Sequence, residues 1–200
     1  MEFSNWQQFE ALLYQLSTAK LKDKKAAQLI SPASYIKDTT RANKNVTGWG
    51  GWAAIDVDDH EFKGDLENEL RSRFGNWYYV CYSTASSTDD FPKFRLVFPL
   101  TSSIDESRIK QFWWALNSEL ESIGDKQTKD LSRMYYIPAT YAGANNFIFT
   151  NTGNHIDPDL LISRHPMPQK SKTIFDGMPD SMKQAIMQYR ANGLTNTNYS

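Results

Sequence analysis

An apolar run ends in two aspartates, Asp56 and Asp58, in the segment Trp52-Ala-Ala-Ile-Asp-Val-Asp58. Side chains alternate between the two faces of a β-strand, so both carboxylates are expected on one side. Neighbouring carboxylates repel each other unless a cation lies between them, and hard oxygen ligands of this kind suit Mg²⁺ or Mn²⁺. The spacing therefore indicates a site for metal-assisted phosphoryl transfer. The alternative is a strand that runs into an acidic surface turn.

A third carboxylate is expected from a neighbouring strand or from the loop that leads into it. The candidates are Asp125 and Asp130, in the segment Gly124-Asp-Lys-Gln-Thr-Lys-Asp-Leu-Ser-Arg133. This segment precedes a predicted strand that we expect beside the third strand of the sheet. We favour Asp125 as the ligand, because Asp130 is the better candidate for accepting backbone N–H groups in a turn.

Groups suited to phosphate accompany these acids. The loop Ser83–Thr88 offers hydroxyl and backbone N–H groups to a triphosphate, although a hydrophilic surface loop has the same composition. Lys93 and Arg95 share a strand face, which is opposite to the apolar neighbours of Arg95. Arg133 can hold a phosphate through two parallel hydrogen bonds, and its alternative is an ion pair with Asp130.

Hydrophobic periodicity and turn residues predict the elements that position these groups. Helices are expected at residues 3–18, where Ser4 and Gln7 form a capping box, and at 61–74, 104–123 and 180–191. Strands are expected at 52–58, 77–83, 94–98, 134–137 and 146–150. The order β-α-β-β-α-β predicts an α+β fold, a ferredoxin- or RRM-like palm-type sheet with an N-terminal helical extension. Right-handed crossovers place both helices on one face and leave the other face open.

With 200 residues, the chain has room for one domain and a small appendage. We predict that an N-terminal helix with a basic, turn-rich module at 1–50 packs on a catalytic palm-like core at 51–152. A proline-rich arm, a short helix and a polar tail follow at 153–200. The tail at 192–200 is expected to be disordered.

Composition narrows the classes of partner and compartment. The 22 basic and 23 acidic residues give a net charge of −1, so any contact with nucleic acid must come from a local patch. The single Cys81 excludes an intramolecular disulfide and a cysteine zinc site, and it fits a reducing compartment. The sequence has no signal peptide and no apolar run of membrane-spanning length, so we expect a cytoplasmic protein without membrane contact.

Three segments together resemble the archaeo-eukaryotic primase superfamily, in its plasmid and phage primase-polymerase branches. Ile55–Asp58 is similar to the first motif of that family, a hydrophobic residue followed by two acids in alternation. Tyr82–Thr88, leading to Pro92–Leu100, resembles the second motif, a serine-bearing loop before a strand with a basic group. Asp125 followed by Asp130–Pro138 resembles the third. The resemblance spans about residues 41–150, over half the chain.

The resemblance implies a DNA primase or primase-polymerase domain. Such a nucleotidyltransferase joins ribo- or deoxyribonucleoside triphosphates on a single-stranded DNA template during phage or plasmid replication, and a replicative helicase domain is an expected partner. The implied ligands of the catalytic Mg²⁺ or Mn²⁺ are Asp56, Asp58 and Asp125. The implied contacts to the nucleotide phosphates are Ser86, Ser87, Lys93, Arg95 and Arg133.

One position departs from the family pattern. Members usually carry a His directly after the loop serine, where this chain has Ser87. Arg95 lies where other branches place their His and is a candidate to replace it. If neither residue serves, the domain binds nucleotide weakly or is inactive. The alternatives are therefore a non-catalytic nucleic-acid-binding replication-initiation domain with a primase-like fold, or another D-x-D metal-dependent enzyme such as a nuclease or glycosyltransferase.

Contacts to the DNA template are expected to be local. Arg41, Lys44 and the basic stretch Lys20–Lys25 can bind the DNA backbone, and an exposed Trp49 or Trp52 can stack on bases. The alternative is that the tryptophans belong to the core and that the basic residues form a solvated surface.

Overall fold

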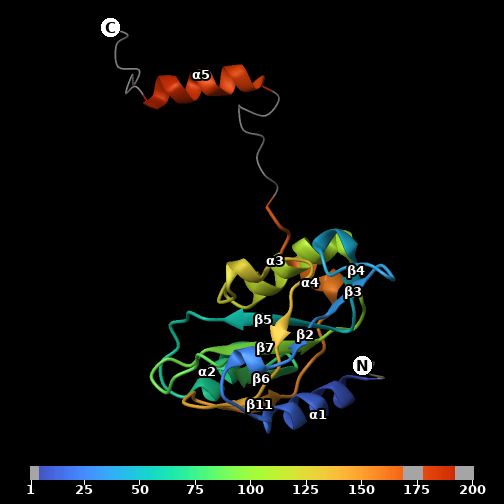
Figure 1. The fold of residues 1–200 in the computed structure, drawn as a ribbon, viewed down its shortest axis with the longest axis vertical. Helices are drawn as coiled ribbons and strands as arrows, with labels where there is room; N and C mark the ends of the chain where they lie inside the picture. The colour runs from blue at the N-terminus through green and yellow to red at the C-terminus, as the bar shows by residue number, and fades with distance from the viewer. Residues whose placement is uncertain (1–4, 169–177, 192–200) are drawn as a thin grey trace. The chain divides into compact units, whose positions relative to one another are not determined.

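The computed structural model describes residues 5–168 and 178–191 of the chain. Met1–Met167 form one compact unit and Pro168–Ser200 form a second. The first unit includes the module at 1–50, which we predicted to pack on the core, the core at 51–152 and the start of the arm at 153–200. The first unit holds the elements from α1 to α4, and the second holds α5 (Asp180–Ala191) (Figure 1).

A four-stranded antiparallel sheet, in the order β11-β6-β7-β5, lies at the centre of the first unit. Its strands are β5 (Trp52–Val57), β6 (Tyr79–Ser83), β7 (Phe94–Pro99) and β11 (Ile148–Asn151). The register places Asp56 of β5 opposite Arg95 of β7, and Tyr82 of β6 opposite the same arginine. Three polar side chains therefore form a row across three strands.

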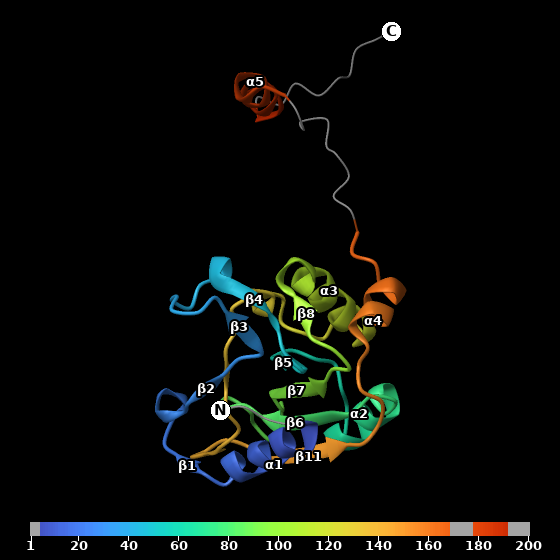
Figure 2. The ribbon, with the colours of Figure 1, turned by 90° about the vertical axis from the view of Figure 1, so that its right-hand side faces the viewer.

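One face of the sheet packs against helices. The apolar cluster on this face joins Ile55, Cys81 and Leu96 to α2 (Leu66–Phe74), α3 (Ile109–Glu119) and α4 (Pro158–Arg164). Ile55 and Leu96 are completely buried. Figure 2 shows α3 and α4 above the sheet and α1 below it. The predicted α+β class and the N-terminal helix are therefore confirmed.

The opposite face is not left open, contrary to our prediction. Helix α1 (Trp6–Ser17) covers the part of this face where β5 begins, through Trp6, Phe9 and Leu13. These residues cluster with Trp52 and Ala54 of β5. Only the part of the face at the C-terminal end of β5 carries charged groups. The amphipathic N-terminal helix accounts for the cover, because its apolar stripe must be buried against another apolar surface.

Short strands connect the N-terminal segment to the rest of the unit. They form three small sheets, β1-β10, β2-β9 and β3-β4-β8. Their bounds are β1 Lys20–Leu21, β2 Leu29–Ile30, β3 Ala33–Tyr35, β4 Val46–Trp49, β8 Ile104–Asp105, β9 Tyr135–Tyr136 and β10 Thr140–Tyr141. The 3₁₀ helices are η1 Lys24–Ala26, η2 Asn43–Asn45, η3 Glu106–Arg108 and η4 Lys126–Thr128.

The strand order differs from the expected ferredoxin-like sheet. The predicted strand at 134–137 is β9, and it pairs with β2 instead of lying beside the third strand of the sheet. The last strand of the sheet is β11, which pairs with the second strand, β6. The outer edge of β5 is instead approached by the segment after α3, where the Asp125 N–H donates to the Asp56 carbonyl at 2.9 Å.

Several predicted boundaries are also corrected. Asn5 caps α1 by accepting the Gln8 N–H at 3.0 Å, whereas the predicted Ser4–Gln7 box involves Ser4, which lies outside the described residues. Asp65 caps α2, which begins at Leu66 and not at 61. The helix predicted at 104–123 is a short strand, a 3₁₀ turn and α3 in succession. The proline-rich arm includes α4. The helix predicted at 180–191 is confirmed, and the predicted tail at 192–200 lies outside the described residues.

Candidate nucleotide site

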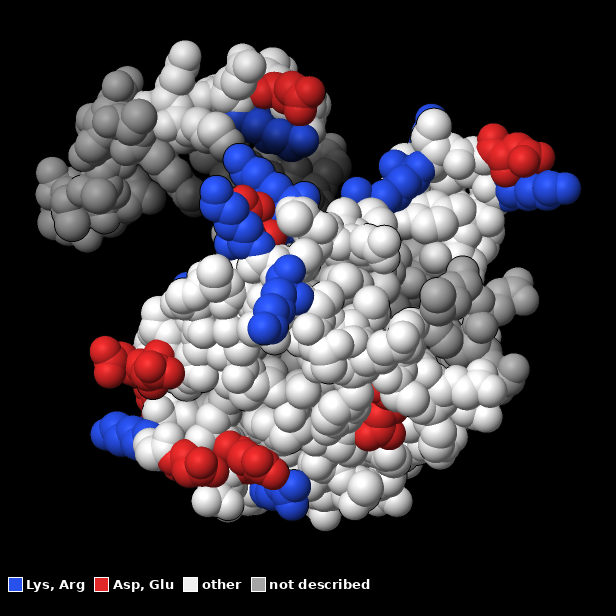
Figure 3. Space-filling view, turned by 60° about the horizontal axis from the view of Figure 1, so that its bottom comes forward, with Lys and Arg blue, Asp and Glu red and all other residues white. Residues whose placement is uncertain are grey.

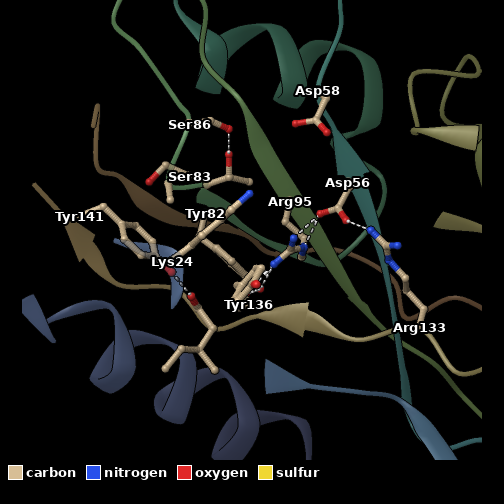
Figure 4. Close-up of a pocket in the computed structure, with 13 residues that line it drawn as sticks. Lys24, Asp56, Asp58, Tyr82, Ser83, Ser86, Arg95, Arg133, Tyr136 and Tyr141 are labelled. Carbon is tan, nitrogen blue, oxygen red and sulfur yellow. Dashed lines mark hydrogen bonds and ion pairs between the residues drawn. The ribbon is translucent and has the colours of Figure 1, made fainter. Parts of the chain in front are cut away.

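A pocket opens on the charged part of the sheet, at the C-terminal end of β5 (Figure 4). Its cavity volume is about 180 Å³. Residues from five separate parts of the sequence line it: Lys24, Asp56, Asp58, Tyr82, Ser83, Thr84, Ala85, Ser86, Arg95, Arg133, Tyr136, Ile137 and Tyr141. The structure thus brings together five of the predicted site residues, Asp56, Asp58, Ser86, Arg95 and Arg133.

The Asp56 carboxylate is held between two guanidinium groups. Its Oδ1 accepts hydrogen bonds from Nε and a terminal nitrogen of Arg95, and both side chains are buried. Its Oδ2 accepts from Arg133, with the nitrogen and oxygen 3.2 Å apart. This pairing explains how a charged carboxylate is tolerated in the sheet, because buried charges require charged and hydrogen-bonded partners.

Aromatic groups complete the environment of Arg95. Its guanidinium donates to the Tyr82 hydroxyl at 3.0 Å and to the Tyr136 carbonyl at 2.6 Å, and it lies 4.8 Å from the Tyr135 ring centre. Burial alone lowers the pKa of Arg95, but its interactions with the Tyr82 hydroxyl and the Asp56 carboxylate outweigh that effect and raise it. Burial raises the pKa of the Tyr82 hydroxyl. Arg95 is therefore permanently charged and rigidly placed.

Asp58 differs from Asp56 although the two share a pocket. It is exposed and makes no hydrogen bond or ion pair with any residue that the structure describes. Its oxygens remain available to a cation. Asp125 lies beside Asp56 through the backbone bond given above, and the Gly124 N–H donates to the buried Asn117 side chain at 2.8 Å, which fixes this segment.

These observations test whether the acids fit a divalent metal. The donor chemistry of Asp56 and Asp58 suits Mg²⁺ or Mn²⁺. Asp56, however, already binds guanidinium through both oxygens. Within residues 5–168 and 178–191, no three His, Cys, Asp or Glu side chains are gathered closely enough to hold a metal. Asp56 and Asp58 are therefore the oxygen donors of the pocket that would hold such a cation, and all three ligands, Asp56, Asp58 and Asp125, stay predictions.

Asp130 lies beside Arg133 at a longer distance. The two side chains approach to 3.9 Å, so the predicted alternative of an ion pair with Asp130 is secondary to the pair with Asp56. The backbone carbonyl of Asp130, and not its carboxylate, accepts the Arg133 N–H in the turn. Asp130 does not line the pocket.

The serine loop divides into an exposed part and a structural part. Ser86 is exposed, lines the pocket and is bonded to Thr84 at 3.3 Å. Ser87, in contrast, is 1 % exposed, and its hydroxyl accepts the Lys93 N–H at 3.1 Å. Neither Ser87 nor Lys93 lines the pocket. The expected phosphate contacts from these two residues are therefore not supported, because Ser87 closes the loop instead.

The predicted contacts to the template need a larger correction. Trp49 is 1 % exposed and donates its indole N–H to the Leu131 carbonyl, so it cannot stack on a base. Trp52 is also buried. Arg41 is exposed, but its Nε donates to the Ser132 carbonyl at 3.1 Å. Trp49 and Arg41 thus hold the loop that carries Arg133, which is a positioning role that the sequence did not indicate.

Lys44 remains exposed on η2 and stays a candidate for DNA contact. On the face that Figure 3 shows, the described Lys and Arg side chains lie singly or in small groups mixed with acidic side chains, over a largely uncharged surface. This distribution is consistent with the net charge of −1 and gives no broad basic stripe on that face. No described helix is long and apolar enough to cross a membrane.

Some residues that line the pocket were not predicted for this site. Tyr136 and Tyr141 come from β9 and β10, and Lys24 comes from η1. The sequence placed Lys24 only in a basic stretch, for which template binding and a solvated surface were the two alternatives. The sequence near Lys24 shows only its positive charge. Its place at the pocket depends on strand pairings between residues more than a hundred positions apart, which local patterns do not reveal.

One known protein family matches most of the chain. The family model of the VapE N-terminal domain matches residues 30–172, and the chain belongs to that family. The matched region includes the whole of residues 41–150, in which the three motifs resemble the primase superfamily.

Other comparisons add little detail. The AEP domain of the cyanophage S-2L primase-polymerase is similar at 15% identity and a TM-score of 0.43, over 67% of this chain and 69% of that chain. A likeness of this size does not by itself establish a shared fold. None of the curated proteins matches the chain.

Proposed function

We propose that this domain binds a nucleoside triphosphate in the pocket and transfers the nucleotide to a growing strand on a single-stranded DNA template. One observation carries the proposal. Two carboxylates, Asp56 and Asp58, line the same small cavity as three cations and a serine loop. Nucleotidyl transfer needs this combination, because negative charge on the phosphates must be neutralised while the reacting oxygens are oriented.

The expected role of each pocket residue depends on how exposed its side chain is. Arg133, whose side chain is 30% exposed, can reach a phosphate while Arg95 stays buried against Asp56. The Ser86 hydroxyl lies at the rim and can donate to a phosphate oxygen. When bound, Mg²⁺ or Mn²⁺ held by Asp56 and Asp58 supplies charge neutralisation at the reacting phosphate.

The proposal is tested most cleanly at Asp58. Asp58→Asn keeps the size of the side chain and removes a charge that no described residue compensates, so the fold should be unchanged. We expect incorporation of nucleotides on a primed single-stranded template with Mn²⁺ to fall by about a thousandfold. The matched control is Asp59→Asn, an exposed neighbour that does not line the pocket.

Equal incorporation by the wild type and both variants would end the proposal of metal-assisted transfer at this site. Shortening of the DNA strand in place of extension would instead identify a nuclease that uses the same acids. Ribonucleoside and deoxyribonucleoside triphosphates are both supplied, so the assay does not presuppose a choice of sugar.

A second function is favoured by one specific feature, the double pairing of Asp56 with Arg95 and Arg133. A carboxylate that is satisfied in this way suits a non-catalytic domain that binds nucleotide or nucleic acid within a replication protein, with a helicase domain as a possible partner. Titration of Mn²⁺ in the presence of a non-hydrolysable triphosphate separates the two functions. The non-catalytic domain binds the triphosphate equally well with and without the metal, whereas the enzyme binds it more tightly with Mn²⁺.

A further inference from the structure

A short segment of the N-terminal extension crosses beside the pocket and is fixed at both ends to residues that line it. This strap comprises residues 20–30. At its start β1 pairs in parallel with β10, which places Leu21 against Tyr141. At its end β2 pairs with β9, which places Leu29 against Tyr136. Both tyrosines line the pocket.

Further backbone bonds secure the same two ends. The Ala142 N–H donates to the Leu21 carbonyl at 3.1 Å, and the Ile137 N–H donates to the Gln28 carbonyl at 3.1 Å. Between these anchors the strap forms η1, whose turn is capped by the Asp23 carboxylate accepting the Lys25 N–H at 2.8 Å. The geometry therefore holds a single turn of chain at the wall of the pocket.

Lys24 is the residue of η1 that lines the pocket. Figure 4 shows its side chain extending toward the space between the Ser86 loop and Arg95. Of the three cations in the lining, Arg95 and Arg133 are paired with Asp56, whereas Lys24 makes no ion pair with any residue in the described part of the chain. Three cations against two carboxylates leave the lining with one positive charge, and the Lys24 ammonium is the cation without a counter-ion.

We propose that the strap is a nucleotide-binding element and that Lys24 binds the phosphate groups of the incoming nucleoside triphosphate. The proposal rests on the function proposed above and adds a residue to it. Lys24 precedes the region 30–172 that the family model matches, so it belongs to an extension and not to the matched region. A flexible, strongly hydrated ammonium suits a mobile polyphosphate, because it needs no fixed geometry to pair with one.

The same assignment explains how the pocket can work with Ser87. That residue is buried in the loop and contributes no charge to the cavity. A cation is then required from elsewhere, and the strap supplies one from a segment far away in the sequence. Asp23 is the positioning residue, because its cap sets the turn that directs Lys24.

The experiment measures binding of nucleotides to the full chain without template, by titration calorimetry or by displacement of a fluorescent triphosphate analogue. Lys24→Gln should weaken binding of a nucleoside triphosphate by about tenfold, the effect of losing one charged contact. The loss should be smaller for the diphosphate and absent for the nucleoside. Lys24→Arg should recover most of the affinity, and Asp23→Ala should give a smaller loss of the same kind.

Lys25→Gln is the matched control, because Lys25 is the exposed neighbour on the same 3₁₀ turn and does not line the pocket. Unchanged triphosphate binding by Lys24→Gln, with binding by the wild type intact, overturns the assignment of the strap and leaves the proposed function standing. A loss that is equal for triphosphate and nucleoside also overturns it, because the effect is then not on phosphate. A wild type that binds no triphosphate overturns both proposals.

Discussion

The two faces of the central sheet are built from the same strands, but one face forms an apolar core and the other carries the charged pocket. On β5, Ala53, Ile55 and Val57 point into the helical face and are completely buried. The alternate residues, Ala54 and Asp56, lie on the other face, where an apolar cluster under α1 gives way to charge. The change occurs within two residues of one strand.

The two faces differ in how they contribute to the free energy of folding. The helical face gains free energy by removing apolar area from water, and its packing needs no polar partners. The charged part of the other face loses hydration at Asp56 and Arg95, and it recovers that loss only through a closed set of hydrogen bonds. A fold selected for stability alone has no need of such a row, which supports a functional reason for it.

The largest expected effect comes from opening the charged row. Asp56→Ala leaves the buried Arg95 without its carboxylate partner, so we expect the free energy of unfolding to fall by about 3–5 kcal/mol. Denaturant unfolding monitored by circular dichroism measures the change. The double variant Asp56→Leu with Arg95→Met, which replaces the pair by apolar side chains, should regain most of the stability. If the single variant is as stable as the wild type, the row does not act as a closed unit.

The helical face gives a matched comparison on β7, the strand that carries Arg95. Leu96→Ala removes a completely buried side chain next to Arg95, and we expect a loss of about 2–5 kcal/mol from lost burial and the cavity that remains. In contrast to the charged row, triphosphate affinity of the folded protein should not change. A variant of Leu96 that stays folded and loses nucleotide binding would show that the two faces are coupled.

A smaller effect on stability is expected at the rim of the pocket. Arg133 is part-exposed and pairs with Asp56 at 3.2 Å, so Arg133→Gln should cost no more than about 1 kcal/mol of stability. Triphosphate affinity should fall by about tenfold, because an exposed guanidinium is available to phosphate. Thermal unfolding and binding on the same preparations separate the two effects. A large loss of stability with unchanged binding would assign Arg133 to the structure instead.

Much of the difference between the two faces can be predicted from the sequence. Side chains alternate between the faces of any strand, so the prediction needs no knowledge of the fold. The spacing of Asp56 and Asp58 predicted one shared side, and the structure places both in one pocket. The apolar neighbours of Arg95 predicted that it points away from the core of helices, and it does. The class of fold followed from the order of elements.

The remaining features depend on contacts between distant segments, which local patterns do not encode. We considered Trp49 as an exposed residue that stacks on bases. In the structure it is buried against α3, and its indole N–H donates to the Leu131 carbonyl. Ser87 lies in a loop whose composition suits ligand binding, but its hydroxyl accepts the Lys93 N–H and so closes the loop. The pairing of β9 with β2 places Lys24 at the pocket, and two-residue strands carry too little periodicity to predict it.

The last comparison concerns pH, where the two faces should respond in the same direction for different reasons. Burial raises the pKa of Tyr79 on the helical face and of Tyr82 on the charged face above the ordinary value of 10.0, and Arg95 opposes the rise at Tyr82. A raised pKa in the folded state means that this state holds its protons more tightly than the unfolded chain. Stability is therefore fully present below pH 10 and is lost as pH rises beyond it.

We expect alkaline unfolding to begin above pH 10, with tyrosinate absorbance of the buried tyrosines and loss of circular dichroism rising together. Arg95→Met removes the cation that favours tyrosinate at Tyr82, so in this variant Tyr82 should resist ionisation more strongly while the fold persists. Tyr79, which has no contact with Arg95 among its neighbouring charges, provides the internal control. Complete ionisation of all tyrosines before any loss of structure would contradict the burial on which both faces depend.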